Sequence, residues 1–204
     1  YKIETAWKKK DLKPAGVFKY FEEICQVPRP SKKEEKMIAY LKAFGAKHNL
    51  ETKVDEAGNV LIKKPATPGK ENLQTVVLQS HIDMVCEKNN DVQHDFLTDP
   101  IETEIDGEWL KAKGTTLGAD NGIGVATELA ILADDSIEHG PLECLFTVDE
   151  ETGLTGAFAL KEGFMSGDIL LNLDSEDEGE IFIGCAGGID SVAEFTYKEV
   201  EVPA

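Results

Sequence analysis

Apolar and polar residues alternate with two different periods along the chain, which predicts helices interleaved with strands. Residues 14–27 (PAGVFKYFEEICQV) space their apolar positions for one face of a helix, and a proline-containing stretch ends that pattern. Ser31 and Glu34 then form an S-x-x-E pattern, which predicts a capping box that opens a second helix through about Ala46. We therefore expect the chain to begin with two helices.

Apolar runs further along the chain predict strands. They comprise two short alternating strands within 51–64 and the longer runs TVVLQS (75–80), LECLFTV (142–148) and DILLNLD (168–174). The three longer runs are apolar almost throughout. Such strands, when they alternate with helices, are typical of a central sheet that is covered on both faces.

Helices and loops are expected between these strands. The glycine-dense segment GTTLGADNGIG (114–124) leads into a helical pattern over 125–135, and a second helical pattern covers 155–162. The polar segment 87–113 predicts a long loop that contains short strands. Loops of that length inside compact domains are usually functional.

Composition and charge restrict the partners that this chain can have. The 39 acidic residues outnumber the 21 basic ones, so that the formal net charge is -18 over 204 residues. This charge opposes broad contact with phosphate backbones or anionic lipid, so we expect neither nucleic acid nor a membrane as a partner. No apolar run approaches the roughly 20 residues of a membrane span.

Cysteine spacing and the N-terminal sequence indicate a cytoplasmic protein. The four cysteines lie far apart and form no C-x-x-C pattern, which argues against a disulfide framework and against a thiolate zinc site. The first ten residues (YKIETAWKKK) lack the apolar stretch of a signal peptide. Because residue 1 is Tyr1 rather than Met, we expect a trimmed, processed or unobserved N-terminus.

Candidate chemistry gathers where the predicted strands end. The polar residues at these ends or in the glycine loop are His81, Asp83, Asp120, Glu150, Glu151 and Asp174. Open α/β sheets bind ligands at this edge, so we expect these side chains to converge. Clustered carboxylates repel one another unless cations neutralise them, and mixed histidine and carboxylate ligands suit zinc, with manganese or cobalt as alternatives.

We expect neighbouring residues in these clusters to have different roles in metal binding and proton transfer. His81 and Asp83 are two apart in an extended segment and face the same side, so His81 can bind a metal while Asp83 fixes its tautomer. Glu150 and Glu151 are consecutive and face different ways, so one could bind metal while the other takes a proton from water. The alternatives are a capped strand end with a solvated aspartate and an ordinary acidic turn.

The glycine-dense loop also raises the alternative of a phosphate-binding site. Gly122 and Gly124 are followed by Thr127 where the third glycine of G-x-G-x-x-G should stand, and no P-loop pattern occurs. A nucleotide-binding domain is therefore disfavoured.

Several motifs together resemble the M20 family of di-zinc metallopeptidases, in particular its bacterial dipeptidases. They are HIDMV (81–85), GTTLGADNGIG (114–124), DEETG (149–153), NLDSEDEGE (172–180) and GEIFIGCAGG (179–188). The resemblance runs from about Lys13 to Gly188. It implies an α/β fold with a central mixed, twisted β-sheet and helices on both faces, of the zinc-peptidase type.

The resemblance also implies a role for each candidate residue. His81 and Asp174 would bind one metal, Glu151 the other, and Asp120 would bridge the two. Glu150 would be the general base and Asp83 would orient His81. The peptide bond between Asp120 and Asn121 would be cis.

The family pattern extends beyond this sequence. It implies that residues 1–188 form the N-terminal part of a discontinuous catalytic domain and that residues 189–204 begin an inserted lid domain or linker. The last histidine ligand of the pattern lies further downstream, and we do not expect His48, His94 or His139 to replace it. The 204 residues alone are therefore expected to show weak or no activity.

The implied function is metal-dependent hydrolysis of dipeptides of the Xaa-His type in the cytoplasm, by an enzyme that forms a homodimer. One alternative is a related M20 amidohydrolase that acts on N-acyl amino acids. Another is a non-catalytic acidic metal-binding module, which the missing histidine favours.

Overall fold

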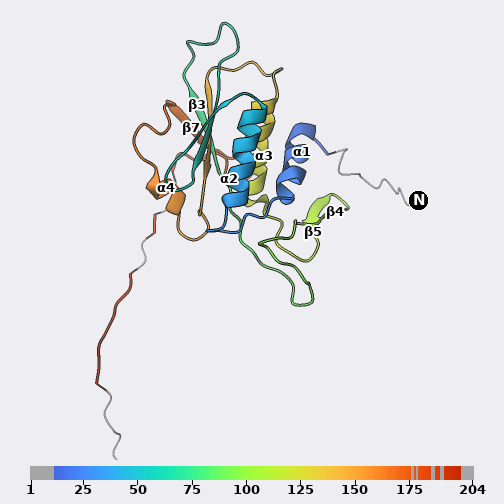
Figure 1. Ribbon diagram of the computed structural model, residues 1–204, viewed down its shortest axis with the longest axis vertical. Coiled ribbons are helices and arrows are strands. Elements are labelled where there is room, and N and C mark those ends of the chain that lie inside the picture. The colour runs from blue at the N-terminus through green and yellow to red at the C-terminus, as the bar shows by residue number, and fades with distance from the viewer. Residues whose placement is uncertain (1–11, 176, 178, 185–186, 189–190, 199–204) are drawn as a thin grey trace, which may run out of the picture. The chain divides into compact units, whose positions relative to one another are not determined.

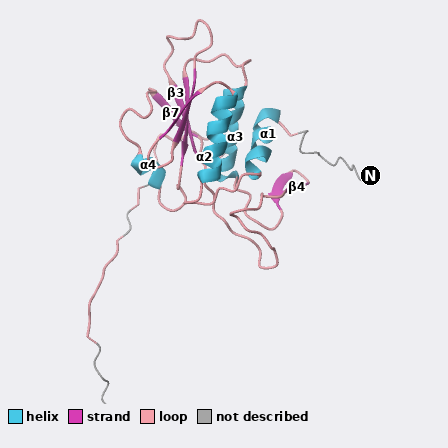
Figure 2. Ribbon diagram, in the orientation of Figure 1, coloured by secondary structure: helices cyan, strands magenta, loops and turns pink. Residues whose placement is uncertain are grey.

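A mixed sheet of five strands is the centre of the computed structural model (Figures 1 and 2). The strand order is β1 (Glu51–Val54), β2 (Val60–Lys64), β6 (Leu142–Thr147), β3 (Val76–His81) and β7 (Ile169–Asn172). Strands β1, β2 and β6 pair antiparallel, whereas β6, β3 and β7 pair parallel. The predicted mixed sheet is therefore confirmed.

The structure describes residues 12–175, 177, 179–184, 187–188 and 191–198. It divides the chain into a unit Tyr1–Asp174, which holds every helix and strand that is described, and a second unit Ser175–Ala204. The domain boundary was predicted between residues 188 and 189. Residue 189 is not among the described residues, so this boundary stays a prediction. None of the described helices is long and apolar enough to cross a membrane.

Helices cover one face of the sheet, and Figure 1 shows them side by side. They are α1 (Ala15–Cys25), α2 (Glu35–Lys47) and α3 (Ala119–Ala133). Apolar side chains from these helices and from one face of β2, β3 and β6 form the main core, in which residues such as Phe21, Leu129 and Phe146 are buried. This burial supplies most of the stabilisation of such a fold.

The opposite face of the sheet has a smaller core. Leu61, Val77 and Leu145 point to this side, and the segment that follows the short helix α4 (Thr155–Ala159) packs its apolar residues on them. Successive strand residues point to opposite faces, so each of these three strands contributes to both cores. Helix α4 ends before Leu160, earlier than the predicted end of the helix at residue 162.

The structure corrects the predicted start of α2. That helix begins at Glu35, and its N-cap residue makes no side-chain capping bond, so the capping box predicted from Ser31 and Glu34 is wrong. The Ser31 hydroxyl instead donates to Asp83, and the Glu34 carboxylate accepts from the backbone N–H of Asp149. Both side chains therefore form hydrogen bonds with the loops that follow β3 and β6.

Helix α3 also differs from its predicted limits. It begins at Ala119, inside the segment expected to be a glycine loop, and Asp120 and Asn121 interrupt it with non-helical backbone. Gly118, just before it, has φ 67°, a left-handed conformation that favours glycine. The long segment 87–113 does contain the expected short strands, which form the hairpin of β4 (Thr103–Asp106) and β5 (Trp109–Ala112).

Candidate metal centre

His81 is the last residue of β3, and its imidazole is buried at the centre of a ring of carboxylates. Its Nε2 atom lies 3.0 Å from Asp120 Oδ1, 3.6 Å from Asp174 Oδ1 and 3.9 Å from Glu150 Oε2. These acids follow the carboxyl ends of neighbouring parallel strands or begin α3, so the topology brings them to one edge of the sheet.

Three sets of described side chains at this edge have ligand atoms within 4.8 Å of one another. Two share His81, as His81, Glu150, Asp174 and His81, Asp120, Glu151, and the third is the buried set Glu34, Asp83, Asp149. The structure thus brings five of the six predicted site residues together around His81 Nε2. Glu150 and Glu151 belong to different sets, which share only His81.

Asp83, the sixth predicted site residue, lies on the other side of the imidazole. Its Oδ1 is 3.3 Å from His81 Nδ1, a longer contact than a typical hydrogen bond. The same carboxylate accepts from the backbone N–H groups of Glu150 (3.0 Å) and Glu151 (3.3 Å) and from the Ser31 hydroxyl (2.8 Å). Asp83 therefore connects the end of β3 to the turn that carries both glutamates.

Asp120 and Asp174 are placed by the start of α3. The Asp120–Asn121 peptide bond is cis, as predicted. The buried Asn121 side chain donates through Nδ2 to the Leu173 carbonyl at 3.2 Å and to the Asp174 carboxylate. The side chain of Asn121 was not singled out in the sequence, where its motif indicated only a loop, yet it ties Asp174 to the residue beside Asp120.

The carboxylates set the charge of the histidine. Burial alone lowers the pKa of His81, but the nearby carboxylates of Asp174, Asp83 and Asp120 raise it to about 11. For Asp83, burial raises the pKa, whereas the hydrogen bonds from His81, the Glu150 N–H and Ser31 together lower it to about 2. The aspartate is therefore ionised at neutral pH.

The two glutamates show the opposite shift. Burial and neighbouring carboxylates raise the pKa of Glu150 and of Glu151 above the usual glutamate range. No lysine or arginine of the described ranges forms an ion pair with any of the five acids that surround His81. The negative field therefore favours a divalent cation, and an imidazole with several carboxylates is a donor set that suits zinc or manganese.

The other histidines lie elsewhere. His48 packs on Phe44 with tilted rings, and His94 contacts Phe96 edge to face, each with ring centroids 4.4 Å apart. His139 precedes β6, where its Nδ1 is 2.7 Å from its neighbour's carbonyl oxygen. Among the four histidines, all of which the structure describes, only His81 belongs to a potential ligand set.

Residues 77–200 match the Peptidase family M20/M25/M40. The chain belongs to this family. It is 52% identical over 193 residues to the cytosol non-specific dipeptidase of Escherichia coli (strain K12), a match that covers 95% of this chain and 40% of that protein.

Two solved structures of peptidases share the fold. The aminoacylhistidine dipeptidase from Vibrio alginolyticus is 55% identical, with a TM-score of 0.85 over 88% of this chain and 36% of that one. Aminopeptidase PepT from Bacillus cereus ATCC 10987 is 26% identical, with a TM-score of 0.68 over 79% of this chain and 43% of that one. The chain thus spans less than half the length of these relatives.

Proposed function

We propose that the protein is a metal-dependent dipeptidase that cleaves Xaa-His dipeptides. The observation that carries the proposal is the cluster of one buried imidazole and four carboxylates at the strand ends of an M20 chain, with which no lysine or arginine of the described residues forms an ion pair. Its similarity to a non-specific dipeptidase and to an aminoacylhistidine dipeptidase supports dipeptides as the substrate class.

Two divalent cations, zinc with manganese or cobalt as substitutes, would be held by this cluster. His81 and Asp174 would bind one cation, Glu151 the other, and Asp120 would bridge them. When bound, they would polarise the scissile carbonyl and lower the pKa of a water molecule. A further histidine ligand would come from sequence beyond Ala204, because the other described histidines lie outside the ligand sets.

Glu150 would be the general base. Its side chain is about one quarter exposed at 28%, lies beside His81 and has a raised pKa, which suits a group that exchanges protons near neutral pH. It would take a proton from the attacking water and return it to the amine that leaves. Asp83 would hold the Glu150 backbone and the His81 ring in place, as the hydrogen bond to the Glu150 N–H supports.

The organisation of the complete enzyme follows the same proposal. Residues 1–188 would be the N-terminal part of a discontinuous catalytic domain, and residues 189–204 would begin a lid domain or linker. The enzyme would act in the cytoplasm as a homodimer, with neither nucleic acid nor a membrane as a partner.

The test measures metal content and hydrolysis on the intact protein and on the 204 residues alone. Substrates are Xaa-His dipeptides, other dipeptides and N-acyl amino acids. We expect two metals and preferred Xaa-His cleavage in the intact protein, with weak or no turnover by the shorter chain. Preferred cleavage of N-acyl amino acids would replace the dipeptidase by an amidohydrolase. A metal-free, inactive intact protein would contradict both.

A further inference from the structure

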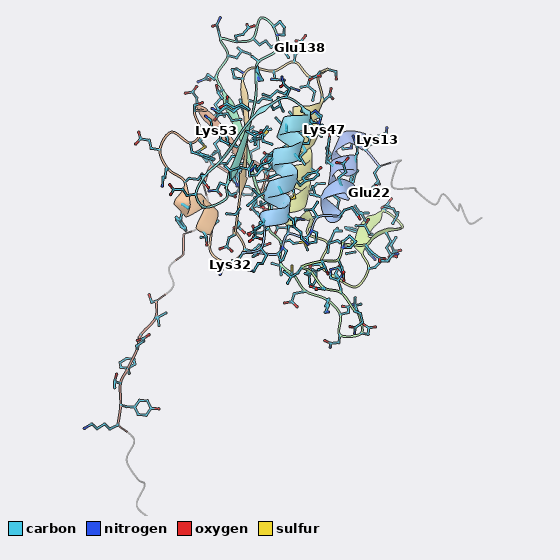
Figure 3. All side chains as sticks on the ribbon, in the orientation of Figure 1. Lys13, Glu22, Lys32, Lys47, Lys53 and Glu138 are labelled. Atoms are coloured by element: carbon cyan, nitrogen blue, oxygen red, sulfur yellow. The ribbon has the colours of Figure 1, made fainter. Side chains whose placement is uncertain are left out.

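The linker between α1 and α2 contacts every loop that carries a candidate ligand except the end of β7. It comprises Arg29 to Glu34, and Lys32, labelled in Figure 3, lies below the lower end of α2 in that view, whereas Glu138 lies above its upper end. Pro30 forms an isolated parallel bridge with Met84, so the linker lies beside the segment that follows His81. The contacts of three of its side chains indicate a common role.

Arg29 joins two of these loops. Its guanidinium is buried, and Nη1 donates to the carbonyls of Ile82 (3.1 Å) and Asp83 (3.0 Å), while Nη2 donates to the carbonyl of Gly118. The first two carbonyls follow His81 and the third precedes Asp120. The spacing between the metal-ligand candidates of β3 and α3 thus depends on one rigid, planar group.

Glycines make room for this guanidinium. A Cβ atom at Gly118 would lie 2.5 Å from Arg29 Nη2, and one at Gly122 would lie 2.6 Å from the same atom. These two residues flank Asp120 in the sequence. The glycine density of the segment 114–124 is therefore explained in part by Arg29, rather than by a phosphate ligand.

Ser31 and Glu34 hold the third loop. The Ser31 hydroxyl donates to Asp83 Oδ2 at 2.8 Å, and Asp83 in turn accepts from the N–H groups of Glu150 and Glu151. Glu34 Oε1 accepts from the Asp149 N–H at 2.9 Å. The turn that carries both glutamates is therefore fixed from two sides by the linker.

We propose that the linker Arg29–Glu34 is the positioning element of the metal centre, and that Ser31 sets the orientation of Asp83 and, through it, of His81. This inference rests on the proposed function, because it assumes that the ring around His81 binds metal. It adds residues that the sequence motifs assigned to helix capping or to no role.

The experiment compares Ser31→Ala with Ser166→Ala in the intact protein. Ser166 is a matched control because its hydroxyl also donates to a buried carboxylate, Glu143 Oε1 at 2.6 Å, next to the opposite end of β6. Zinc Kd is measured by competition with a chelating dye. The ring-nitrogen resonances of His81 are recorded in ¹⁵N-histidine-labelled, zinc-loaded protein, to which residues 1–204 contribute four histidines.

We expect Ser31→Ala to weaken zinc binding by about 10-fold, the lower end of the range for groups that orient metal ligands, and to shift the His81 Nδ1 resonance. Ser166→Ala should leave both unchanged, and Ser31→Thr, which keeps a hydroxyl, should restore both. Equal zinc affinity and unchanged His81 resonances in Ser31→Ala would overturn the inference. Absence of zinc binding in the wild type would instead overturn the proposed function.

Discussion

The two ends of strand β6 surround their carboxylates with opposite charges. Near its start, Glu143 has a side chain only 3% exposed, and Lys63 Nζ lies 2.5 Å from Oε1. The backbone N–H groups of Ser166 (2.7 Å) and Gly167 (3.2 Å) donate to the other oxygen. Beyond its end, Glu150 and Glu151 lie among carboxylates, and no lysine or arginine of the described chain pairs with them.

The pKa shifts express this difference. Burial alone raises the pKa of Glu143, but Lys63, Ser166 and the Ser166 N–H outweigh it and lower the pKa below the usual range. For Glu150 and Glu151, burial and the neighbouring acids raise the pKa. A cluster of partly buried acids that no lysine or arginine neutralises is therefore a better candidate for a metal site than a single acid with its own lysine.

Glu150→Gln should have the largest effect, because it removes the proposed base and keeps the shape of the side chain. We expect kcat for dipeptide hydrolysis to fall by about 10²–10⁴-fold while bound zinc, measured by atomic absorption, stays near the wild-type amount. Glu143→Gln is the control at the other end of β6 and should keep kcat. Substantial turnover by Glu150→Gln would exclude Glu150 as the base.

Removal of metal should affect the carboxylates around His81, beyond the end of β6, and leave Glu143 near the start of β6 unaffected. The carboxylates around His81 would lose their counter-charge, so a chelator should lower the free energy of unfolding by about 4 kcal/mol when zinc had been present at 1,000 times its Kd. Thermal unfolding of the intact protein, with and without chelator, measures this change. Asp120→Ala should abolish the response to chelator, whereas Glu143→Gln should retain it. An identical Tm in both conditions would argue against a bound cation.

Glu143→Ala should destabilise the fold without changing dipeptide hydrolysis. The substitution leaves Lys63, whose side chain is 25% exposed, without its carboxylate. It also leaves the backbone N–H groups of Ser166 and Gly167 without their acceptor. We expect a loss of about 2–3 kcal/mol in urea unfolding, below the range for a fully buried pair. Activity and zinc affinity at a temperature where the variant is folded should equal the wild type. A matching loss of zinc affinity would show that the two ends are coupled.

Glu128 of α3 offers a third arrangement, because it lies beside Cys144 in the middle of β6 and Ser80 of β3. Complete burial raises its pKa well above the usual value, so the folded protein holds it neutral. Its contribution to stability is complete below the unfolded pKa of about 4.3 and is lost as pH rises towards the folded pKa. Glu128→Gln should therefore be more stable than the wild type at pH 7 and equal to it near pH 4. Urea titrations at both pH values measure this, and an equal or lower stability at pH 7 would mean that the buried carboxyl is better satisfied than its surroundings indicate.

The sequence predicted the convergence of the acids because strand ends follow from local apolar patterns. His81, Glu150 and Asp174 each come directly or almost directly after an apolar run, and a parallel arrangement brings such ends together. The main strands were predicted for the same reason, whereas the mixed order of the sheet was implied by the family resemblance.

The supporting residues could not be found in this way. Ser31 and Glu34 match a capping box in sequence, but their hydrogen bonds reach Asp83 and Asp149, 52 and 115 residues away. Local patterns carry no information about such partners. Arg29 stands between two prolines, a position that does not indicate its partners. Its role depends on loops that only the tertiary structure places beside it.

The hydrogen bonds of the α1–α2 linker also have a kinetic consequence. They close loops of 52 to 115 residues, and contacts between residues so distant in sequence form late in folding because loop closure costs entropy. The ring around His81 would then be complete only after the transition state. Zinc should accordingly slow the unfolding rate and leave the refolding rate nearly unchanged.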